Sequence, residues 1–364
     1  MVRTLNILTI SNYSYTNSAR PEVNIFIELA KLGHRVKVIT YPGTAFVDDL
    51  KKAGVVVVEK HPTKKLQWKS IRSIRRILTS EKIDILHMYN STAISNGVWA
   101  AIGLPTKVII YRGYPGNIHW YDPVQYFKFL HPRIDYIICN AQNVAQWFQK
   151  QLFFKKSKAV TIQKGHSVHW FKNVIAKDLS NLHIDPKDFV ISVVANDRPI
   201  KGVHVLLESI GLLPTNLNIH FLMIGNGMDN KRNLEIIQNY KHKDRIHFLG
   251  YQSDPLSWVK ASNAMIMPSI GAESLTKSII EAACLEVAPL LSDLPGNKDL
   301  FVQGESCLKF PPNDTLRMAD SIVRVYEDRE LCTSLGINAR KFIDDHLNIN
   351  DTVSAYQELY DRII

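Results

Sequence analysis

Short apolar segments alternate with amphipathic segments along the whole chain. In the first half, runs rich in Val, Ile and Leu predict strands over Leu5–Ser11, Arg35–Thr40, Val55–Glu59, Ile85–Tyr89, Lys107–Arg112, Tyr136–Asn140 and Ala159–Ile162. Between them, apolar positions at helical spacing predict helices over Pro21–Gly33, Ser70–Lys82, Ala93–Gly103 and Asn143–Leu152. Pro21 suits a first helical position and Gly33 a helix end. Such alternation favours a parallel sheet with helices on both faces.

The same pattern restarts in the second half. It predicts strands over Phe189–Ala195, Asn218–Gly225, Arg245–Gly250, Ala264–Ser269 and Ala288–Asp293. Helices are predicted over Gly202–Leu213, Thr276–Glu286, Leu316–Asp328 and Thr352–Ile364, and the polar stretch Lys172–Asp188 is interpreted as a linker. A chain of 364 residues fits two domains. We expect them at 1–170 and 171–349, with the last helix, about 350–364, able to pack back on the first domain.

The charge is unevenly distributed between the halves. Residues 1–175 hold 25 Lys and Arg against 9 Asp and Glu, a balance of +16, whereas the rest holds 19 against 25, a balance of −6. A basic first half favours an anionic partner such as a phospholipid surface, a lipid-linked phosphate or a nucleic acid.

Several common classes lack their sequence signals here. No apolar run approaches the length of a membrane span, and the first residues lack a secretory signal, so we expect a cytosolic protein. The four cysteines are far apart and have no zinc-site spacing, which indicates reduced thiols in or near the core. Neither the glycine-rich dinucleotide fingerprint nor the P-loop motif occurs, which disfavours dehydrogenases and P-loop enzymes.

The sharpest chemical signal is a pair of glutamates, Glu273 and Glu281, after the strand that ends at Pro268-Ser269. A helix that begins near Ser274 would place the two carboxylates roughly 10–12 Å apart, given a rise of about 1.5 Å per residue. That separation suits a sugar and a ribose on either side of a pyrophosphate, which would meet the N–H groups of the first turn, Ser274 to Thr276. The competing interpretation is an acid at a helix start and a second acid on the helix surface.

This segment resembles the family 4 glycosyltransferases, whose signature is two glutamates separated by seven residues after a Pro-Ser strand end. Further segments match the family in order and spacing: Gly33–Val36, Asp84–His87, Lys164–His166, Val193–Gly202, Met223–Gly227, Phe248–Gly250 and Ser292–Leu300. The resemblance covers essentially the whole chain and is strongest in residues 189–310. The sequence departs from the family in its loop Asn12–Ser18, in Arg112-Gly113, and in Ser274 and Glu286, where glycines are common.

The resemblance implies an α/β chain of the GT-B class, with two doubly wound Rossmann-like domains facing each other across a cleft. It implies a retaining glycosyltransferase with a nucleotide-sugar donor and no metal or other cofactor. Arg198 and Lys201 would bind the donor diphosphate and, with Glu273 at the sugar, form the catalytic set. Donor contacts are expected from Glu281 at the ribose and from Ser274, Leu275, Thr276, Gly225 and Asn196.

The expected acceptor is a lipid-linked or lipopolysaccharide-type cell-surface glycan, contacted by Asn12, Arg112 and His119. Lysines and arginines surround Trp68 on the predicted helix from Ser70, and Trp147, Phe148, Phe153 and Phe154 adjoin Lys155, Lys156 and Lys158. Basic and aromatic residues together suit an anionic membrane surface, so we expect a peripheral protein at the inner face of the cell membrane that does not bind nucleic acid. The alternative interpretation of these segments is a solvent-exposed helix face whose basic residues contact water and whose aromatic residues lie in the core.

Two rival functions stay open at this point. One is another nucleotide-sugar enzyme of the same architecture, such as an epimerase, which needs no acceptor. The other is a non-catalytic module that binds membranes or nucleic acids. Release of nucleotide from a nucleotide-sugar would separate an enzyme from a binding module.

Overall fold

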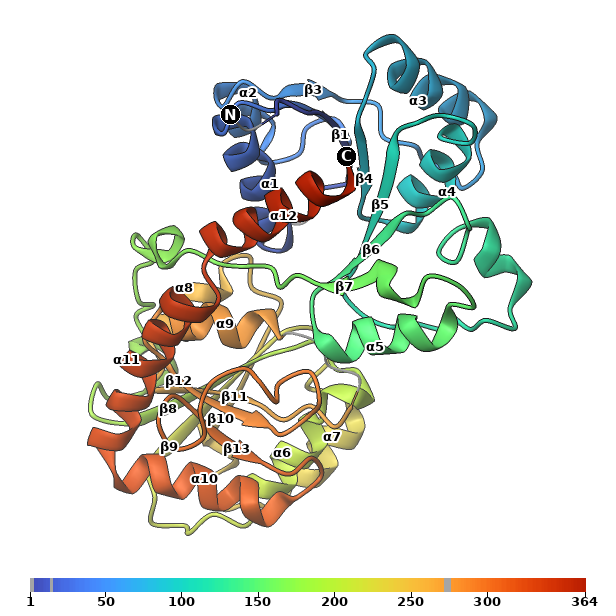
Figure 1. Cartoon of the computed structure of the whole chain (residues 1–364). Coiled ribbons are helices and arrows are strands. Elements are labelled where there is room, and N and C mark those ends of the chain that lie inside the picture. The colour runs from blue at the N-terminus through green and yellow to red at the C-terminus, as the bar shows by residue number, and fades with distance from the viewer. Residues whose placement is uncertain (1–2, 14–15, 272–275) are drawn as a thin grey trace. The chain divides into compact units, whose positions relative to one another are not determined.

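The chain folds into two compact units. The computed structural model describes residues 3–13, 16–271 and 276–364. Unit 1 comprises residues 1–166 and 347–364, and unit 2 comprises residues 167–346. Each unit contains one parallel β-sheet with helices packed on it (Figure 1).

Unit 1 is built on a seven-stranded sheet of order β3-β2-β1-β4-β5-β6-β7. Its strands are β1 (Asn6–Ile10), β2 (Arg35–Ile39), β3 (Val56–Val58), β4 (Ile85–Met88), β5 (Lys107–Arg112), β6 (Tyr136–Cys139) and β7 (Ala159–Thr161). All paired strands are parallel, and Ile7 of β1 is in register with Val36 on one side and Ile85 on the other. The strand order reverses between β1 and β4, and such reversals create crevices at the carboxyl ends of strands.

The helices of unit 1 cover the sheet, and all but the last lie between its strands in the sequence. They are α1 (Thr16–Lys31), α2 (Val47–Lys52), α3 (Trp68–Ser80), α4 (Ser91–Ala100), α5 (Gln142–Gln151) and α12 (Ile349–Ile363), with the 3-10 turns η1 (Pro123–Phe127) and η2 (Lys156–Lys158). Asn90 caps α4 by accepting a hydrogen bond from the backbone N–H of Ala93 at 2.9 Å. Pro21 lies inside α1 rather than at its first position, so that sequence interpretation was wrong.

Unit 2 is built on a six-stranded sheet of order β10-β9-β8-β11-β12-β13. Its strands are β8 (Phe189–Val194), β9 (Ile219–Ile224), β10 (Ile246–Gly250), β11 (Ala264–Met267), β12 (Ala288–Ser292) and β13 (Leu308–Phe310). Its helices are α6 (Val203–Ile210), α7 (Lys231–Ile237), α8 (Pro255–Lys260), α9 (Lys277–Cys284), α10 (Thr315–Glu327) and α11 (Arg329–His346). Its 3-10 turns are η3 (Val168–Phe171), η4 (Ser180–Leu182), η5 (Pro199–Lys201) and η6 (Lys243–Arg245). Again the paired strands are parallel.

The chain returns to unit 1 through α12. His166 donates from its backbone N–H to Leu347 at 2.8 Å and accepts from Ile349 at 3.0 Å, so the outgoing and returning segments are hydrogen-bonded. Gly165 lies so close to Asn348 that a Cβ atom would fall 2.0 Å from the Asn348 carbonyl oxygen. Tyr356 and Tyr360 of α12 are fully buried, and Figure 1 shows α12 lying beside α1. The last helix is therefore part of the unit 1 core.

The polar stretch interpreted as a linker belongs to unit 2. Ile184 is 6% exposed and packs with Val190 and Leu222, and Lys177 donates a backbone hydrogen bond to Ser257 at 2.9 Å. This stretch looks like a linker because most of its residues are polar, yet a few apolar side chains fix it to the sheet.

The core of each unit consists of apolar side chains from both faces of its sheet. Leu8, Ile10 and Ile110 are fully buried in unit 1, and Phe189 and Ile266 are fully buried in unit 2. Burying one such side chain contributes about 1.5–3 kcal/mol. The four cysteines, Cys139, Cys284, Cys307 and Cys332, are free and buried, as expected from the sequence.

Candidate functional site

Three loops meet at the carboxyl edge of the unit 2 sheet. The loop after β8 accepts and donates backbone hydrogen bonds across this edge: Asp197 donates to Asn226 after β9 at 2.9 Å, and Ile270 after β11 donates to Ile200 at 2.9 Å. Asn230 also donates a side-chain hydrogen bond to Asp197. These bonds hold the loops after β8, β9 and β11 as one assembly.

Two glycines permit this close approach. At Gly225, after β9, φ is +141°, and a Cβ atom would lie 1.8 Å from the carbonyl oxygen of Ala195. At Gly202, before α6, φ is +67°, and a Cβ would lie 2.0 Å from the carbonyl oxygen of Pro268. Both conformations favour glycine, and neither position has space for a side chain. The resemblance had placed Gly225 among the donor contacts, and the geometry makes it the point where two loops touch.

The two predicted diphosphate ligands flank the turn η5 at this edge. Arg198 precedes η5 in extended conformation and is exposed, and Lys201 is the last residue of η5 and half-buried. The backbone N–H of Lys201 donates to the carbonyl of Arg198 at 2.7 Å, which holds the two residues in one turn. Asn196 lies in the same loop and is exposed. Together they present two cations at the carboxyl edge, where ligands bind in doubly wound sheets.

The beginning of α9 lies at the same edge. Thr276 is its N-cap residue, and the Thr276 hydroxyl donates to Oδ1 of Asn297 at 3.0 Å instead of capping the helix. Asn297 is fully buried and donates to the carbonyl of Ser292 at 3.3 Å. The first turn of α9 thus receives no side-chain cap from Thr276, and its N–H groups are suited to an anion.

The glutamate pair is only partly described. Glu273, Ser274 and Leu275 lie outside the described residues. The described helix begins at Lys277, so Ser278 and Ile279, rather than the predicted Ser274 to Thr276, supply its first-turn N–H groups.

Glu281 lies about one turn inside α9, because the helix begins at Lys277 and not near Ser274, as the sequence had indicated. Glu281 is 8% exposed, and its Oε1 atom lies 3.2 Å from Nζ of Lys277, one turn earlier on the helix. This pairing keeps the carboxylate oriented along the helix surface. A buried, oriented carboxylate is suited to accept hydrogen bonds from hydroxyl groups.

In unit 1, two of the three predicted acceptor residues lie at the carboxyl edge of the seven-stranded sheet. Asn12 follows β1, and Arg112 is the last residue of β5. Arg112 is 8% exposed, and its guanidinium carbon lies 4.3 Å from the ring centroid of Phe129 and 4.9 Å from that of Tyr114. Burial lowers the pKa of Arg112. Among the described residues its buried Nε has no hydrogen-bond partner, which makes it a candidate donor to an anionic ligand.

The third predicted acceptor residue, His119, lies in a cluster of rings instead. Its ring stacks on Tyr121 with centroids 4.9 Å apart and meets the edge of Trp147 at 5.5 Å. His119 therefore fixes the loop after β5 against Trp147 of α5.

A buried cluster that sequence reasoning missed lies beside Arg112. Nζ of Lys164 is 3.1 Å from Oε2 of Glu22 and 4.0 Å above the ring centroid of Tyr111. Glu22 is 5% exposed, and burial raises its pKa although Lys164 acts in the opposite direction. The sequence signal was available, because Glu22 shares a helical face with Phe26 and Leu29, both fully buried.

The basic and aromatic segments separate into buried and exposed parts. On α3, Ile74 and Leu78 are buried in the core, and the basic side chains face solvent. Phe148 of α5 is fully buried and Trp147 packs against the core, so for these two the core interpretation is right. Phe153 and Phe154 are exposed.

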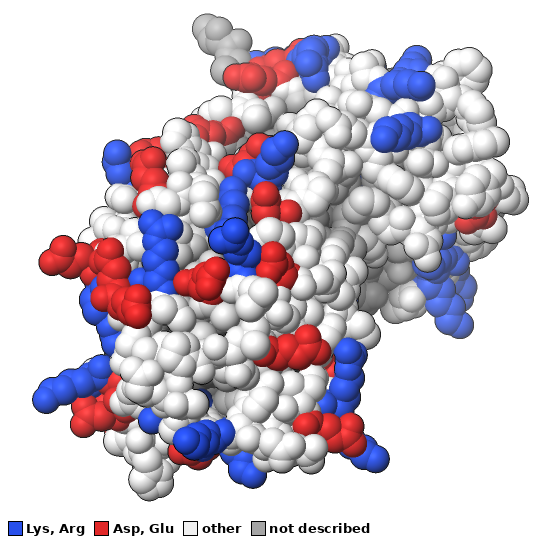
Figure 2. All heavy atoms as spheres, turned by 90° about the horizontal axis from the view of Figure 1, so that it is seen from below, with Lys and Arg blue, Asp and Glu red and all other residues white. Residues whose placement is uncertain are grey.

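The charge asymmetry follows the units. Unit 1 holds 25 Lys and Arg against 12 Asp and Glu, a balance of +13, and unit 2 holds 19 against 22, a balance of −3. On the face drawn in Figure 2, basic and acidic side chains are interspersed over much of the surface.

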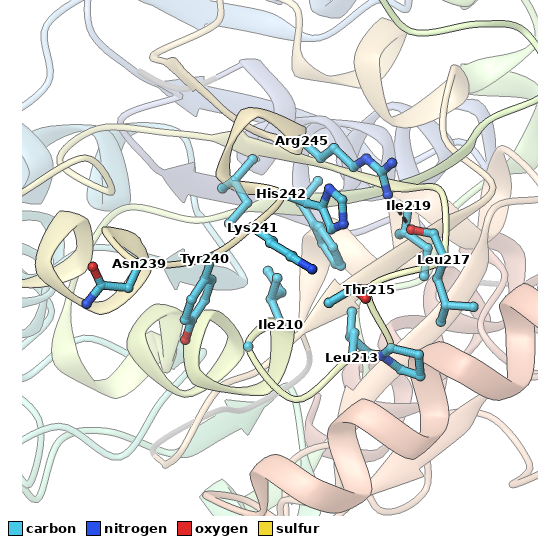
Figure 3. Close-up of a pocket in the computed structure, with 14 residues that line it drawn as sticks. Ile210, Leu213, Thr215, Leu217, Ile219, Asn239, Tyr240, Lys241, His242 and Arg245 are labelled. Carbon is cyan, nitrogen blue, oxygen red and sulfur yellow. Dashed lines mark hydrogen bonds between the residues drawn. The ribbon is translucent and has the colours of Figure 1, made fainter.

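Unit 2 also contains an apolar pocket away from this site (Figure 3). It has a volume of about 290 Å³ and is lined by Ile219 and Ile246, which begin β9 and β10, and by Tyr240 and His242. Tyr240 donates its hydroxyl hydrogen bond to Leu207 at 3.1 Å. The pocket lies at the amino ends of the strands and is therefore separate from the loops that carry Arg198 and Lys201.

Within residues 3–13, 16–271 and 276–364, no three His, Cys, Asp or Glu side chains are grouped as a metal site requires. The described helices include none that is both long and apolar enough to cross a membrane.

Comparison with protein families matches both units. The model described as "Glycosyl transferases group 1" matches residues 174–342, and that described as "Glycosyltransferase Family 4" matches residues 23–169. The two matches include the loops at both carboxyl edges.

Two curated relatives and one solved structure illustrate the similarity. The chain is 26% identical over 311 residues to the UDP-Gal:alpha-D-GlcNAc-diphosphoundecaprenol alpha-1,3-galactosyltransferase of Escherichia coli, covering 80% of this chain and 79% of that protein. It is 22% identical over 191 residues to the N-acetyl-alpha-D-glucosaminyl L-malate synthase of Bacillus anthracis, covering 52% of this chain and 50% of that protein. The crystal structure of HepE from Anabaena in complex with UDP superposes with a TM-score of 0.78 at 15% identity, covering 98% of this chain and all of that chain.

The extent of these matches limits what each one shows. The chain spans about half the length of the first curated relatives that it matches. The structural likeness, at this identity, shows the fold, which is the GT-B fold expected from the sequence.

Proposed function

The chain belongs to the family 4 glycosyltransferases, and from this premise we propose that it transfers a sugar from a nucleotide-sugar donor to a glycan acceptor. The observation that carries the proposal is the carboxyl edge of unit 2, where hydrogen bonds join the loop that carries Arg198 and Lys201 to the loop after β11. That second loop leads into α9, which contains the buried Glu281. These groups match the parts of a nucleotide-sugar: two anionic phosphates and two sets of hydroxyl groups.

The donor diphosphate is assigned to Arg198 and Lys201 together with the first turn of α9. Cleavage of the bond between sugar and phosphate leaves negative charge on the departing diphosphate. Cations and helix N–H groups fixed at that position stabilise this charge as it develops, which lowers the barrier. Because these groups can carry the charge, the proposal includes no metal ion and no other cofactor. UDP in the complex of the similar HepE structure supports a nucleoside diphosphate as the ligand class.

Glu281 is assigned to the ribose hydroxyls and Glu273 to the donor sugar. The pairing of Glu281 with Lys277 holds its carboxylate in one orientation, which favours bidentate acceptance from two neighbouring hydroxyls. Retention of the anomeric configuration is part of the proposal and rests on family membership.

The acceptor is assigned to unit 1, at the carboxyl edge that carries Asn12 and Arg112. The buried guanidinium of Arg112, with Nε unpartnered among the described residues, favours an acceptor that carries a phosphate or carboxylate. The similar galactosyltransferase of Escherichia coli is named for a diphosphoundecaprenol-linked acceptor. A lipid-linked or lipopolysaccharide-type glycan therefore fits both the charge at this edge and the net charge of +13 on unit 1.

An acceptor on a lipid requires the protein to work at a membrane. We propose peripheral association of unit 1 with an anionic bilayer surface, on the cytoplasmic side where nucleotide-sugars are supplied. The excess of basic residues in unit 1 supports it, since each Lys or Arg beside such a surface contributes about 1 kcal/mol.

The test of the activity is release of nucleotide from UDP-, GDP-, ADP- and CDP-sugars, after thermal-shift screening has shown which nucleotide binds. One nucleotide should raise the melting temperature, and its sugar should release nucleotide faster when a lipid-diphosphate glycan is added. Release that does not depend on any acceptor, with an altered sugar recovered still attached to nucleotide, would instead support an epimerase. Absence of binding by all four nucleotides would remove the enzyme proposal.

A further inference from the structure

Unit 1 contains a cavity at the amino edge of its seven-stranded sheet, opposite the edge that carries Arg112. Its volume is about 770 Å³. Lys107 and Tyr136, the first residues of β5 and β6, line it, as does Lys158, which directly precedes β7. Parallel strands place these three residues at one edge, and the turn after α5 closes the cavity with Phe153 and Phe154.

The charge lining this cavity is positive. Four cations line it, Lys107, Lys155, Lys158 and Arg362, against one acid, Asp135. Asp135 is already engaged, because its Oδ2 accepts from Arg133 at 2.7 Å and from the backbone N–H of Val108 at 2.8 Å. The lining therefore favours an anion.

One of these cations is buried. Lys158 is 9% exposed, and its Nζ donates to the carbonyl oxygen of Ile134 at 3.2 Å. Burial lowers the pKa of Lys158, and this outweighs the opposite effect of Asp135. An anion placed beside the ammonium group would act in the opposite direction and stabilise its charged form.

A surface of exposed aromatic side chains adjoins the cavity. We call it the aromatic ridge: Trp120, Tyr121, Phe153 and Phe154, with exposed fractions of 50%, 65%, 59% and 85%. The ring centroids of Trp120 and Phe153 are 5.4 Å apart, and those of Trp120 and Tyr121 are 5.8 Å apart, so the ridge is continuous from the loop after β5 to the turn after α5. Lys155 and Lys156 follow Phe154 directly and are exposed.

The ridge differs from the other basic surface of unit 1, on α3. There Trp68 is 67% exposed, and Lys69, Arg72 and Arg76 line a shallow depression beside it. The apolar face of α3 is turned into the core, where Ile74 and Leu78 are buried, so the helix has no apolar face left for a bilayer. Of these two surfaces, the ridge is the one that combines several exposed rings with a cationic cavity.

We infer that the aromatic ridge inserts into the headgroup region of a membrane while the neighbouring cavity binds the phosphate of an anionic phospholipid. Aromatic rings favour the interface between hydrocarbon and water, and Lys and Arg beside them bind anionic headgroups. The cavity supplies several cations around one phosphate, and the exposed Phe154 supplies the apolar group next to it. The inference rests on the proposed membrane association and assigns it to a surface at the edge of the sheet away from Arg112.

The experiment measures association of the whole chain with sedimented vesicles of phosphatidylcholine alone and of an equimolar mixture of phosphatidylcholine and phosphatidylglycerol. Phe154→Ser should lower the association constant for the anionic vesicles about tenfold, because burying one aromatic side chain contributes on that order. Lys155→Gln should lower it about fivefold, since one cation is removed from an anionic surface. The matched controls are Trp68→Ser and Lys69→Gln on α3. Each should change the association constant for the anionic vesicles by less than about threefold.

Each outcome separates the inference from its alternatives. If Phe154→Ser and Lys155→Gln lose no more vesicle binding than their α3 controls, the attraction is diffuse and electrostatic, and the assignment is overturned. Binding of soluble glycerol 3-phosphate that is lost in Lys155→Gln, without any binding to vesicles, would show a site for a free phosphate and overturn the membrane partner. Nucleotide release is measured in parallel without vesicles, and both ridge variants should retain it. If that activity is absent while the ridge variants still lose vesicle binding, the proposed activity fails and the docking surface stands.

Discussion

Lys164 and Glu22 form an ion pair inside unit 1, with Nζ of the lysine 3.1 Å from Oε2 of the glutamate. The pair joins α1 to the segment that leaves unit 1 at His166, and the ammonium group also lies over the ring of Tyr111. Side-chain exposure is 18% for Lys164 and 7% for Glu22, so water compensates little if one partner is removed. Removing one charge of a buried pair leaves the other uncompensated, which is more costly than replacing both.

Lys164→Met should therefore destabilise unit 1 by about 3–5 kcal/mol. The double variant Lys164→Met with Glu22→Gln should recover a large part of the loss, because no isolated charge stays buried. Urea denaturation of both variants measures this. A loss below about 1 kcal/mol in the single variant would mean that water reaches Glu22 and that the pair behaves like one on the surface.

His87 should make the stability of unit 1 depend on pH. Burial lowers the pKa of His87 to about 3 from its usual 6.5, and Lys164 contributes in the same direction. Between these values the unfolded chain binds a proton at His87 and the folded chain does not, so stability falls as the pH falls, by up to about 1.4 kcal/mol per unit from this group. His87→Phe should show a smaller loss between pH 6.5 and pH 4 than the wild type, whatever its stability at neutral pH. Identical slopes in chemical denaturation would exclude His87 as a source of acid sensitivity.

Lys201→Ala tests the diphosphate assignment. Loss of one hydrogen bond to a charged group removes about 1.5–3 kcal/mol, so the affinity for the nucleoside diphosphate should fall roughly tenfold to a hundredfold. Calorimetric titration of the nucleotide selected by thermal shift measures it. Lys231→Ala, which removes a 92% exposed lysine from the same unit, is the control and should bind normally. Normal affinity in Lys201→Ala would take this lysine out of the donor site.

The two glutamates should differ in their kinetic effects. Glu281→Gln should raise the donor KM more than it lowers kcat, because a ribose contact is shared by the ground state and the transition state. Glu273→Gln should lower kcat strongly with a smaller effect on nucleotide affinity, because the donor sugar gains positive charge as its bond to phosphate breaks. Steady-state kinetics with separately measured nucleotide affinities distinguish the two patterns. A near-normal kcat in Glu273→Gln would show that the roles are assigned wrongly.

Gly225→Ala should disturb the donor edge without a change of charge. Its Cβ would lie 1.8 Å from the carbonyl oxygen of Ala195, so the loops after β8 and β9 would have to separate. Gly250→Ala is the control, because its φ of +61° is also positive but no atom lies within 4 Å of the new Cβ. We expect nucleotide affinity to fall at least tenfold in the first variant and to stay within about threefold of normal in the second. Equal nucleotide affinities in Gly225→Ala and Gly250→Ala would mean that the contact between the two loops does not position Arg198 and Lys201.

The sequence predicts the fold well because its signal is local. All strands of unit 1 occur within two residues of their predicted ranges, since short apolar runs bounded by polar residues specify buried parallel strands. α11 was not predicted, because its apolar positions are separated by polar and charged residues and follow α10 after a single residue. Pro21 was misplaced because a proline usually begins a helix, whereas α1 starts earlier, at Thr16.

The site is less predictable from sequence because it depends on contacts between distant segments. The motif around Arg198 and Lys201 could be recognised, but the hydrogen bonds that join it to Asn226 and Ile270 could not. Phe148 and Phe154 each follow another aromatic residue, yet one is fully buried and the other 85% exposed, because α5 ends between them at Gln151. At Glu286 a sequence pattern did carry structural information. This residue has a left-handed backbone, with φ of +62°, at a position where the family commonly has glycine.

The return of the chain through α12 has a consequence for biosynthesis. Unit 2 is one continuous segment, so it can complete its core as soon as residue 346 has left the ribosome. Unit 1 cannot, although most of it is made before unit 2, because the fully buried Tyr356 and Tyr360 are translated only after all of unit 2. Until then the surface that receives α12, including His87 with its hydrogen bond to Tyr360, stays open to water and to chaperones. Of the two units, the one whose synthesis begins earlier is thus the one whose core is completed later.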